Sequence, residues 1–306
     1  MEASSHGLKQ NRLDGLQFDV GIFTNLSHEH LDYHKTMKDY LNSKLYLFEH
    51  LIKKEGNIIT DANIPQNKRI KNISKKKRMS LNLIFSKEKG IELISHRFIN
   101  QKQILEIGFN NKIYKLKLDL IGKIQIKNIL MAAIAAQKSN LNFENILKVL
   151  PELKPVEGRL EKIGTIKNNS IVILDYAHTP DALKVCLLNI KEQFPDKKLN
   201  LLFGCGGNRD QNKRMKMGKI ASIYADNIYL TDDNPRYENP VKIRKDIKKG
   251  INTKKITEMS NREKAISQVF LAGKAKTSQL FRKCLIAQKS EDLLIHNAAV
   301  PKPINA

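Results

Sequence analysis

The stretch S-H-E-H-L-D-Y-H contains three histidines, His28, His30 and His34. It follows residues 18–26 (FDVGIFTNL), whose apolar run predicts a buried strand, and open α/β sheets bind ligands at the carboxyl ends of their strands. The imidazoles could bind a metal together with the carboxylates of Glu29 and Asp32, as in a zinc hydrolase. No distant set of matching ligands supports zinc, and a polar loop that caps the next helix explains the spacing equally well.

A glycine-rich loop, G-C-G-G-N-R-D, begins at Gly204 after an all-apolar segment. Glycines let backbone N–H groups approach an anion, and the N-terminus of a following helix favours negative charge. The loop lacks the G-x-G-x-x-G spacing, so a plain tight turn stays open as an alternative. Arg209 is suited to bind a carboxylate or a phosphate through two hydrogen bonds. Cys205 has no apparent base beside it, and we expect a small buried thiol.

Two further polar clusters also follow apolar segments. D-Y-A-H-T-P begins at Asp175, and D-D-N-P-R occupies residues 232–236. If the preceding strands are parallel, all three clusters lie at one edge of a sheet. That edge is the usual ligand crevice of a doubly wound sheet, so the three together predict a binding site.

The elements that position these clusters follow from periodicity. In the first half we expect a helix over 36–53, a short strand over 57–60, antiparallel strands between 79 and 121, and helices over 128–137 and 143–150. In the second half we expect strands over 170–175, 199–203 and 227–231, with helices over 180–193, over 215–224 and from 240. Continuous apolar strands that alternate with helices are typical of a parallel sheet covered on both faces. Prolines at 151 and 155 predict a boundary between a domain of residues 1–150 and one of 151–306, whose pattern weakens from about residue 274.

Composition limits the other functions. Lys and Arg number 54 against 31 Asp and Glu, a net charge of +23 that favours anionic partners. Aromatic residues are only 6% of the chain and the lysines are spread evenly, as over 213–219, so we expect a solvated lysine surface and no nucleic-acid partner. No run of about 18 apolar residues predicts a membrane span. Without a secretory signal, and with three cysteines that cannot all pair, we expect a cytoplasmic monomer.

Taken together, several segments resemble the Mur ligase family, in the form that adds the third residue of the peptidoglycan stem peptide. The matching segments are MEASSHGLKQNRLDG, FTNLSHEHLDYHKTMKDYLNSK, VEGRLEKIG, DYAHTPDAL, FGCGGNRDQNKR and TDDNPRYENP, in that order. The resemblance implies an α/β fold: part of the central ATPase domain, followed by a Rossmann-like C-terminal domain that binds the amino acid.

The resemblance also implies a reaction. In the family, ATP phosphorylates the carboxylate of UDP-MurNAc-L-Ala-D-Glu, and the amine of the incoming amino acid attacks the acyl phosphate. The D-N-P-R form resembles that of members that add meso-diaminopimelate. An arginine there suits this substrate, because it has a distal carboxylate that lysine lacks.

Site residues are implied position by position. Glu2, His30 and Lys44 resemble Mg²⁺ ligands, with Lys44 as a carbamate and with His30 and Lys44 in the catalytic centre. A carbamate supplies oxygen ligands suited to Mg²⁺, although Lys44 taken alone is also explained as a solvated helix lysine. The resemblance assigns contacts to the muramoyl peptide to Ser4, Gln10 and Arg12. It assigns nucleotide contacts for ATP to Asn128, Arg159 and Asp175, and the amino-acid pocket to Arg209, Asp233, Asn234 and Arg236.

The sequence departs from the family pattern in three places. The family's G-T-N-G-K-T phosphate loop and its later G-K-G-H-E segment are not found in the 306 residues, and residues 124–125 read Ile-Gln where the family has Phe-Asn. Without the phosphate loop, ATP loses both positioning and charge neutralisation. We therefore expect the chain alone to be inactive or impaired as a ligase. The alternative hypothesis is a non-catalytic protein that retains the amino-acid pocket.

Overall fold

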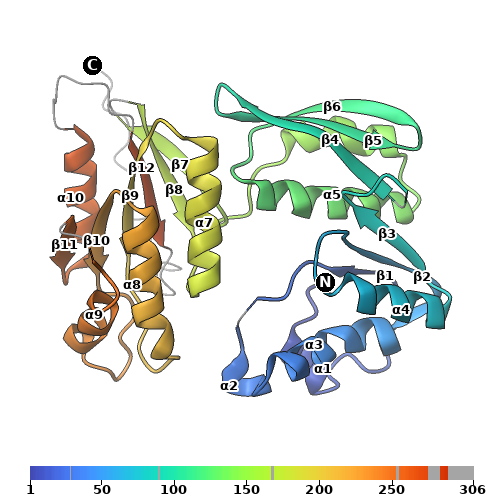
Figure 1. Cartoon of the computed structure of the whole chain (residues 1–306), viewed down its shortest axis with the longest axis horizontal. Coiled ribbons are helices and arrows are strands. Elements are labelled where there is room, and N and C mark those ends of the chain that lie inside the picture. The colour runs from blue at the N-terminus through green and yellow to red at the C-terminus, as the bar shows by residue number, and fades with distance from the viewer. Residues whose placement is uncertain (28, 89, 167–168, 253–254, 275–282, 289–306) are drawn as a thin grey trace. The chain divides into compact units, whose positions relative to one another are not determined.

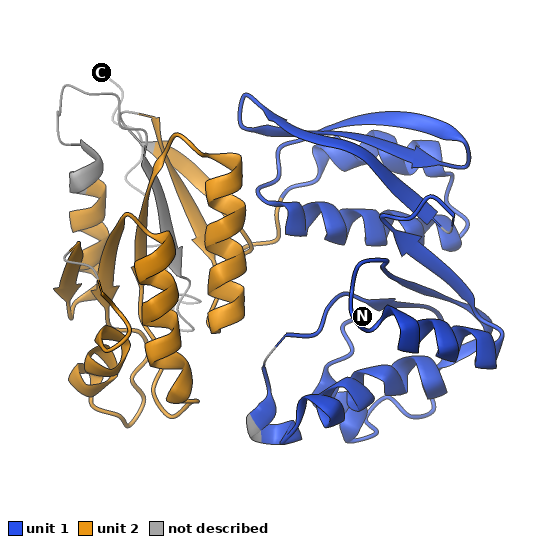
Figure 2. Cartoon of the chain, in the orientation of Figure 1, with its two compact units in different colours: residues 1–154 blue, residues 155–306 orange. Residues whose placement is uncertain are grey.

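The computed structural model describes residues 1–27, 29–88, 90–166, 169–252, 255–274 and 283–288. The chain divides into two compact units, residues 1–154 (unit 1) and 155–306 (unit 2), shown in Figure 2. Each contains a six-stranded sheet with helices packed on it, which confirms the predicted α/β class. Among the described residues, no helix combines the length and the apolar character needed to cross a bilayer.

Unit 1 has strand order β1-β2-β3-β4-β5-β6 (Figure 1). The strands are β1 (Phe18–Phe23), β2 (Ile52–Asp61), β3 (Ser80–Ile84), β4 (Gly90–Ile99), β5 (Lys102–Phe109) and β6 (Lys112–Leu118). The first four are parallel, and β4, β5 and β6 form an antiparallel meander. The prediction of antiparallel strands over 79–121 is therefore right for β4 to β6 and wrong for β3.

The helices of unit 1 pack on this sheet. They are α1 (Ser5–Lys9), α2 (Leu31–His34), α3 (Met37–Tyr46), the π-helical turn η1 (Leu47–Leu51), α4 (Asn67–Lys77), α5 (Lys123–Lys138), α6 (Phe143–Val149) and the 3₁₀ turn η2 (Leu150–Glu152). On α5, Ile126, Leu130, Ala133 and Ile134 form one buried stripe, as helical periodicity predicts. The helix predicted over 36–53 is shorter than expected. Because β2 pairs with β1 from Ile52 onward, the strand takes over residues assigned to the helix.

Unit 2 has strand order β11-β10-β9-β12-β8-β7. Its elements are β7 (Glu161–Ile166), β8 (Ser170–Asp175), α7 (Pro180–Gln193), β9 (Lys198–Phe203), α8 (Asn212–Tyr224), β10 (Asn227–Thr231), α9 (Pro240–Lys248), β11 (Ile256–Met259), α10 (Arg262–Lys274) and β12 (Lys283–Gln288). All neighbouring strands are parallel except β7, which is antiparallel to β8. The predicted parallel sheet is confirmed.

Strand β12 lies in the middle of this sheet, hydrogen-bonded to β8 on one side and to β9 on the other. This strand falls in the segment from about residue 274 whose pattern weakens in the sequence. The rest of the segment with the weakened pattern, 275–282 and 289–306, lies outside the described residues. The centre of the sheet is thus completed by a strand that follows the other five in the chain.

Candidate functional site

The first group of predicted residues surrounds Lys44 on α3. The Lys44 ammonium lies 5.3 Å from the ring centroid of Tyr40 and 5.9 Å from that of Phe23. Burial lowers the pKa of Lys44, while the negative charges of Glu29 and Glu2 oppose this effect. Lys44 is therefore not the solvated helix lysine of the simpler interpretation. More of its amine is neutral than in water, and the neutral amine is the form that reacts with CO₂.

His30 belongs to the same group. Its backbone is left-handed, with φ of 58°, at the residue before α2. His30 Nε2 lies 3.9 Å from Glu29 Oε2. Glu29 is one of the two carboxylates near Lys44. It belongs to the histidine-rich stretch that could bind a metal, but the family resemblance gave it no role. Glu2, Glu29, His30 and Lys44 together are called the Lys44 cluster below.

His34 has a different place from His30. It is buried, hydrogen-bonded to Ser5 Oγ at 2.9 Å and to Ser43 Oγ at 3.4 Å, and its ring stacks on Tyr40. These contacts join α1 to α3 and leave no position for a metal. His28 lies outside the described residues, and no group of three or more His, Cys, Asp or Glu in the described part of the chain could hold a metal. The zinc interpretation gains no support.

The residues predicted to contact the muramoyl peptide lie in and just after α1. Ser4 is the N-cap of α1, with its hydroxyl accepting the Gly7 N–H at 3.1 Å. Gln10 donates to the Tyr33 hydroxyl at 3.0 Å, and Arg12 is exposed. Ser4 therefore already has a local structural role.

The three polar clusters of unit 2 do lie at one edge of the sheet, because β8, β9 and β10 run in the same direction. The loop after β9 (residues 204–211, loop 1) contacts the loop after β10 (residues 232–239, loop 2) directly. The Gly207 N–H donates to the Asn234 carbonyl, and an Arg236 guanidinium N–H donates to the Gly207 carbonyl, both at 2.8 Å. The Tyr237 N–H donates to Asn208 Oδ1 at 3.0 Å. The predicted amino-acid pocket is thus built from two interlocked loops.

Glycine is required where these loops touch. A Cβ on Gly207 would lie 1.9 Å from the Pro235 carbonyl oxygen, and one on Gly204 would lie 2.4 Å from the Thr231 carbonyl oxygen. The glycines therefore serve close approach between two backbones. This is a reason for glycine that neither the anion-binding nor the tight-turn interpretation supplied.

Asp233 stands out among the predicted pocket residues. Its Oδ1 is buried and has no hydrogen-bond partner in the described structure. A buried, unpaired carboxylate oxygen is costly, and a cationic amino group would satisfy it. The Arg209 side chain, in loop 1, is exposed. The side chains of Arg236 and Asn234, in loop 2, are partly buried.

The predicted nucleotide contacts fall in both units. In unit 2, Asp175 accepts N–H groups from Leu160 at 2.8 Å and from Ala177 at 2.9 Å, and burial raises its pKa. The Arg159 guanidinium lies 5.1 Å from the Tyr176 ring centroid. Asn128 belongs to unit 1, where it is exposed on α5. The structure brings Arg159 and Asp175 together within unit 2.

Cys205 is buried, and its Sγ lies 3.7 Å from Met217 Sδ. Burial raises the pKa of Cys205 to about 12. A thiol with this pKa is not a nucleophile at neutral pH. The prediction of a small buried thiol is confirmed.

The side chains that support loop 2 were not among the residues predicted from the sequence. Arg214 on α8 is fully buried and pairs with Glu238 and Asp246, although it falls in the stretch expected to be a solvated lysine face. Arg244 pairs with the carboxylate of Asp232, and Arg262 donates to the Asp232 carbonyl at 3.2 Å. For Arg214 a signal existed, because it shares a helical stripe with the buried Met217, Gly218 and Ala221.

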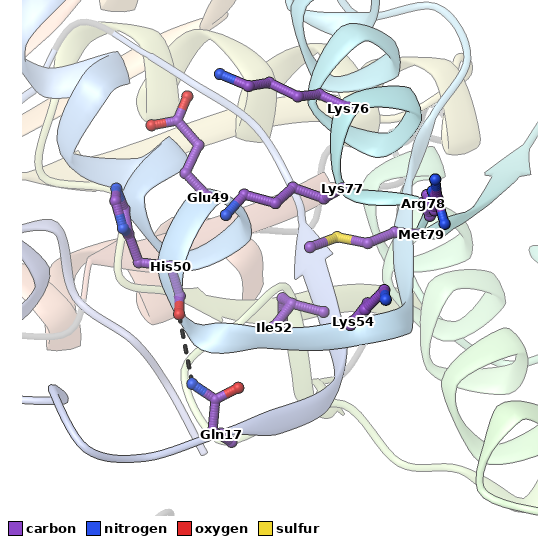
Figure 3. A pocket seen from close by; sticks show the side chains of 9 residues that line it. All are labelled: Gln17, Glu49, His50, Ile52, Lys54, Lys76, Lys77, Arg78 and Met79. Carbon is purple, nitrogen blue, oxygen red and sulfur yellow. Dashed lines mark hydrogen bonds between the residues drawn. The ribbon is translucent and has the colours of Figure 1, made fainter.

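Unit 1 also has a hollow of about 400 Å³ that none of the predicted site residues line. Figure 3 shows its lining side chains, Gln17, Glu49, His50, Ile52, Lys54, Lys76, Lys77, Arg78 and Met79. Lys76 and Lys77 are the last two residues of α4. Cations at this position interact favourably with the partial negative charge of the helix C-terminus. The positive charge is thus explained without a ligand.

The parallel sheet of unit 2, with polar loops at its carboxyl edge, defines a Rossmann-like domain. Comparison with known families matches the Mur ligase middle domain over residues 1–136 and the Mur ligase glutamate ligase domain over residues 158–279. The chain belongs to the Mur ligase family, as its motifs predicted.

Individual relatives agree with this assignment. The chain is 39% identical over 266 residues to the UDP-N-acetylmuramoyl-L-alanyl-D-glutamate–2,6-diaminopimelate ligase of Rickettsia typhi, covering 87% of this chain and 53% of that protein. It is 38% identical to the ligase of the same name from Buchnera aphidicola subsp. Schizaphis graminum, covering 96% of this chain and 62% of that protein. The chain thus spans about half the length of the curated relatives it matches.

Solved structures show the same fold. A structure of a ligase of this name matches with a TM-score of 0.62 and 28% identity, over 94% of this chain and 58% of that one. Mycobacterium tuberculosis folylpolyglutamate synthase, solved with ADP and AMPPCP, matches with a TM-score of 0.71 at 15% identity, over 88% of this chain and 61% of that one. The second likeness concerns the fold alone.

Proposed function

We propose that this chain contributes the metal-binding and amino-acid-binding parts of an ATP-dependent ligase that adds meso-diaminopimelate to UDP-MurNAc-L-Ala-D-Glu in the cytoplasm. The observation that carries this proposal is the interlocking of loops 1 and 2, which gathers Arg209, Asp233 and Arg236 at one edge. The names of the relatives from Rickettsia typhi and Buchnera aphidicola support the choice of substrates.

The amino-acid pocket follows from charge complementarity. Diaminopimelate carries two ammonium and two carboxylate groups. The unpaired, buried oxygen of Asp233 is suited to accept a hydrogen bond from an ammonium group. Guanidinium groups at Arg209 and Arg236 are suited to bind carboxylates through paired hydrogen bonds, with Asn234 as a neutral polar neighbour. Lysine has no distal carboxylate, so an arginine for that group would favour diaminopimelate.

The Lys44 cluster fits Mg²⁺ by the chemistry of its donors. Glu2 supplies a carboxylate, His30 an imidazole, and Lys44 a carbamate oxygen once its amine has reacted with CO₂. The lowered pKa of Lys44 and the nearby charges of Glu2 and Glu29 agree with this arrangement. Bound Mg²⁺ would neutralise charge on the phosphates of ATP. Ser4, Gln10 and Arg12 would contact the muramoyl peptide, and Asn128, Arg159 and Asp175 the nucleotide.

The test is ADP release from Mg²⁺-ATP in the presence of UDP-MurNAc-L-Ala-D-Glu and meso-diaminopimelate. The purified chain is assayed alone and with the N-terminal part of the Rickettsia typhi ligase. We expect release that depends on diaminopimelate in the supplemented reaction, and its loss in Asp233→Ala. No release in either reaction, together with no binding of diaminopimelate to the chain, would reject the proposal.

A second candidate is a protein that binds the amino acid without ligating it. Both loops of the proposed pocket belong to unit 2, and this second candidate assigns no role to unit 1. Calorimetry with meso-diaminopimelate and L-lysine discriminates the two candidates. Preferential binding of diaminopimelate without ADP release in the supplemented reaction would favour this second function.

A further inference from the structure

Arg214 is the largest fully enclosed side chain among the described residues. It lies in the first turn of α8, directly after loop 1, and points away from solvent. Its Nη2 donates to Glu238 Oε1 at 2.9 Å, and its Nη1 donates to Asp246 Oδ2 on α9 at 3.4 Å. Its buried Nε has no hydrogen-bond partner in the described structure. One guanidinium thus joins the helix after loop 1 to the end of loop 2 and the helix that follows it.

Glu238 makes this connection reach the loops themselves. The same oxygen that accepts from Arg214 accepts the backbone N–H of Asn208 at 2.5 Å. The other oxygen lies 3.5 Å from the Gln211 side-chain amide. The Asn208 N–H, and then Arg214, hold the pKa of Glu238 below its ordinary value, so the carboxylate is charged at neutral pH. A residue of loop 2 therefore fixes the backbone of loop 1, one residue before Arg209.

Stability alone is a poor explanation for this arrangement. Removing a guanidinium from water costs free energy that its ion pairs only partly return, and an apolar side chain of similar volume is often as stabilising. Here the guanidinium also leaves one N–H unsatisfied. A buried charge that adds so little stability is better explained by the geometry that it imposes on its partners.

We infer that the Arg214–Glu238 pair is a positioning device that sets the separation of Arg209 and Arg236, and with it the preference for an amino acid with a second carboxylate. The inference rests on the proposed function of the pocket. Neither Arg214 nor Glu238 needs to touch the substrate. Glu238 lies two residues after Arg236 and is hydrogen-bonded to the residue before Arg209, so both arginines depend on its position.

The test uses the full chain and titrates meso-diaminopimelate and L-lysine separately by calorimetry. The double variant Arg214→Met/Glu238→Gln removes the charged pair but keeps volume, and the amide oxygen of the new glutamine can still accept the Asn208 N–H. The matched control, Lys112→Met/Glu144→Gln, makes comparable changes at an exposed ion pair of 2.8 Å in unit 1. Thermal midpoints are measured for all variants.

We expect the double variant to bind diaminopimelate at least tenfold more weakly than the wild type, while lysine binding changes less than threefold. The ratio of the two affinities is the decisive readout, because a general loss of structure would lower both. The control should retain the wild-type ratio. An unchanged ratio in a folded double variant would overturn the inference.

If the double variant does not fold, Glu238→Gln alone replaces it and is expected to reduce the ratio about threefold or more. An unchanged ratio in that folded variant overturns the inference equally. A wild-type chain that does not bind diaminopimelate contradicts the proposed function instead. The two failures are therefore distinguishable.

Discussion

Replacing Gly207 with alanine should separate the two pocket loops. The added Cβ would lie 1.9 Å from the Pro235 carbonyl oxygen. An ordinary carbon–oxygen contact is about 3.3 Å, so the backbones must part by about 1.4 Å. Two hydrogen bonds of 2.8 Å cross this contact, from Gly207 N–H to the Asn234 carbonyl and from Arg236 to the Gly207 carbonyl.

The cost has two parts. Overpacking of this kind costs about 1–3 kcal/mol of unfolding free energy. Displacing Arg236 loses a charge-assisted hydrogen bond worth about 1.5–3 kcal/mol, and a loss of that size at the substrate carboxylate would weaken binding by about tenfold or more. We therefore expect Gly207→Ala to lose about 2.5–6 kcal/mol of stability, the two costs together, and at least about tenfold in affinity for diaminopimelate.

Urea unfolding followed by circular dichroism measures the first quantity, and calorimetry with meso-diaminopimelate measures the second. Gly164→Ala is the matched control, because a Cβ at Gly164 meets no atom within 4 Å and its φ is not in the left-handed region. If Gly207→Ala is as stable as Gly164→Ala and binds as tightly, the two loops are not held as the structure describes, and the reasoning is refuted.

Three further predictions concern single groups. Burial raises the pKa of Cys205 to about 12, so iodoacetamide at pH 8 should modify this thiol in urea but not in the native chain. Labelling is measured by mass spectrometry of the peptide that contains Cys205, and equal labelling in both conditions would contradict the prediction. Lys44, whose pKa burial lowers, should give a carbamate resonance in ¹³C NMR with ¹³C-bicarbonate that is absent from Lys44→Arg, and a spectrum identical for both would argue against the carbamate. The pKa of Glu238 is lower in the folded than in the unfolded chain, so the stability it contributes is complete above about pH 4.3 and is lost as the pH falls through the folded-state value. Thermal midpoints measured from pH 6 to pH 3 should therefore fall less in Glu238→Gln than in the wild type, and parallel curves would contradict the assignment.

Much of unit 2 could be predicted because its elements carry local signals. Residues 170–175 and 227–231 are apolar runs that end in polar clusters, and both strands occur within those bounds. The helix over 180–193 begins at a proline after Thr179, whose hydroxyl accepts the Ala182 N–H as the N-cap. The alternation of such elements implied a parallel sheet. It therefore also implied that the polar clusters after β8, β9 and β10 share one edge.

Other features depend on partners far away in the chain, and local pattern does not report them. The strand over 283–288 exists because β8 and β9 provide hydrogen bonds on both sides, and its six residues carry little periodicity of their own. Residue 52 begins a strand rather than continuing a helix because β1 pairs with it.

The same reason explains what the sequence could and could not tell about the site. Residue types and their order were enough to identify the family and to predict the pocket residues, because motifs are local. The helical stripe could indicate that Arg214 is buried, but not its partners, because Glu238 and Asp246 come within hydrogen-bonding distance of its charge only through folding. The clearance at Gly207 likewise depends on Pro235, 28 residues along the chain, and only the tertiary structure sets that contact.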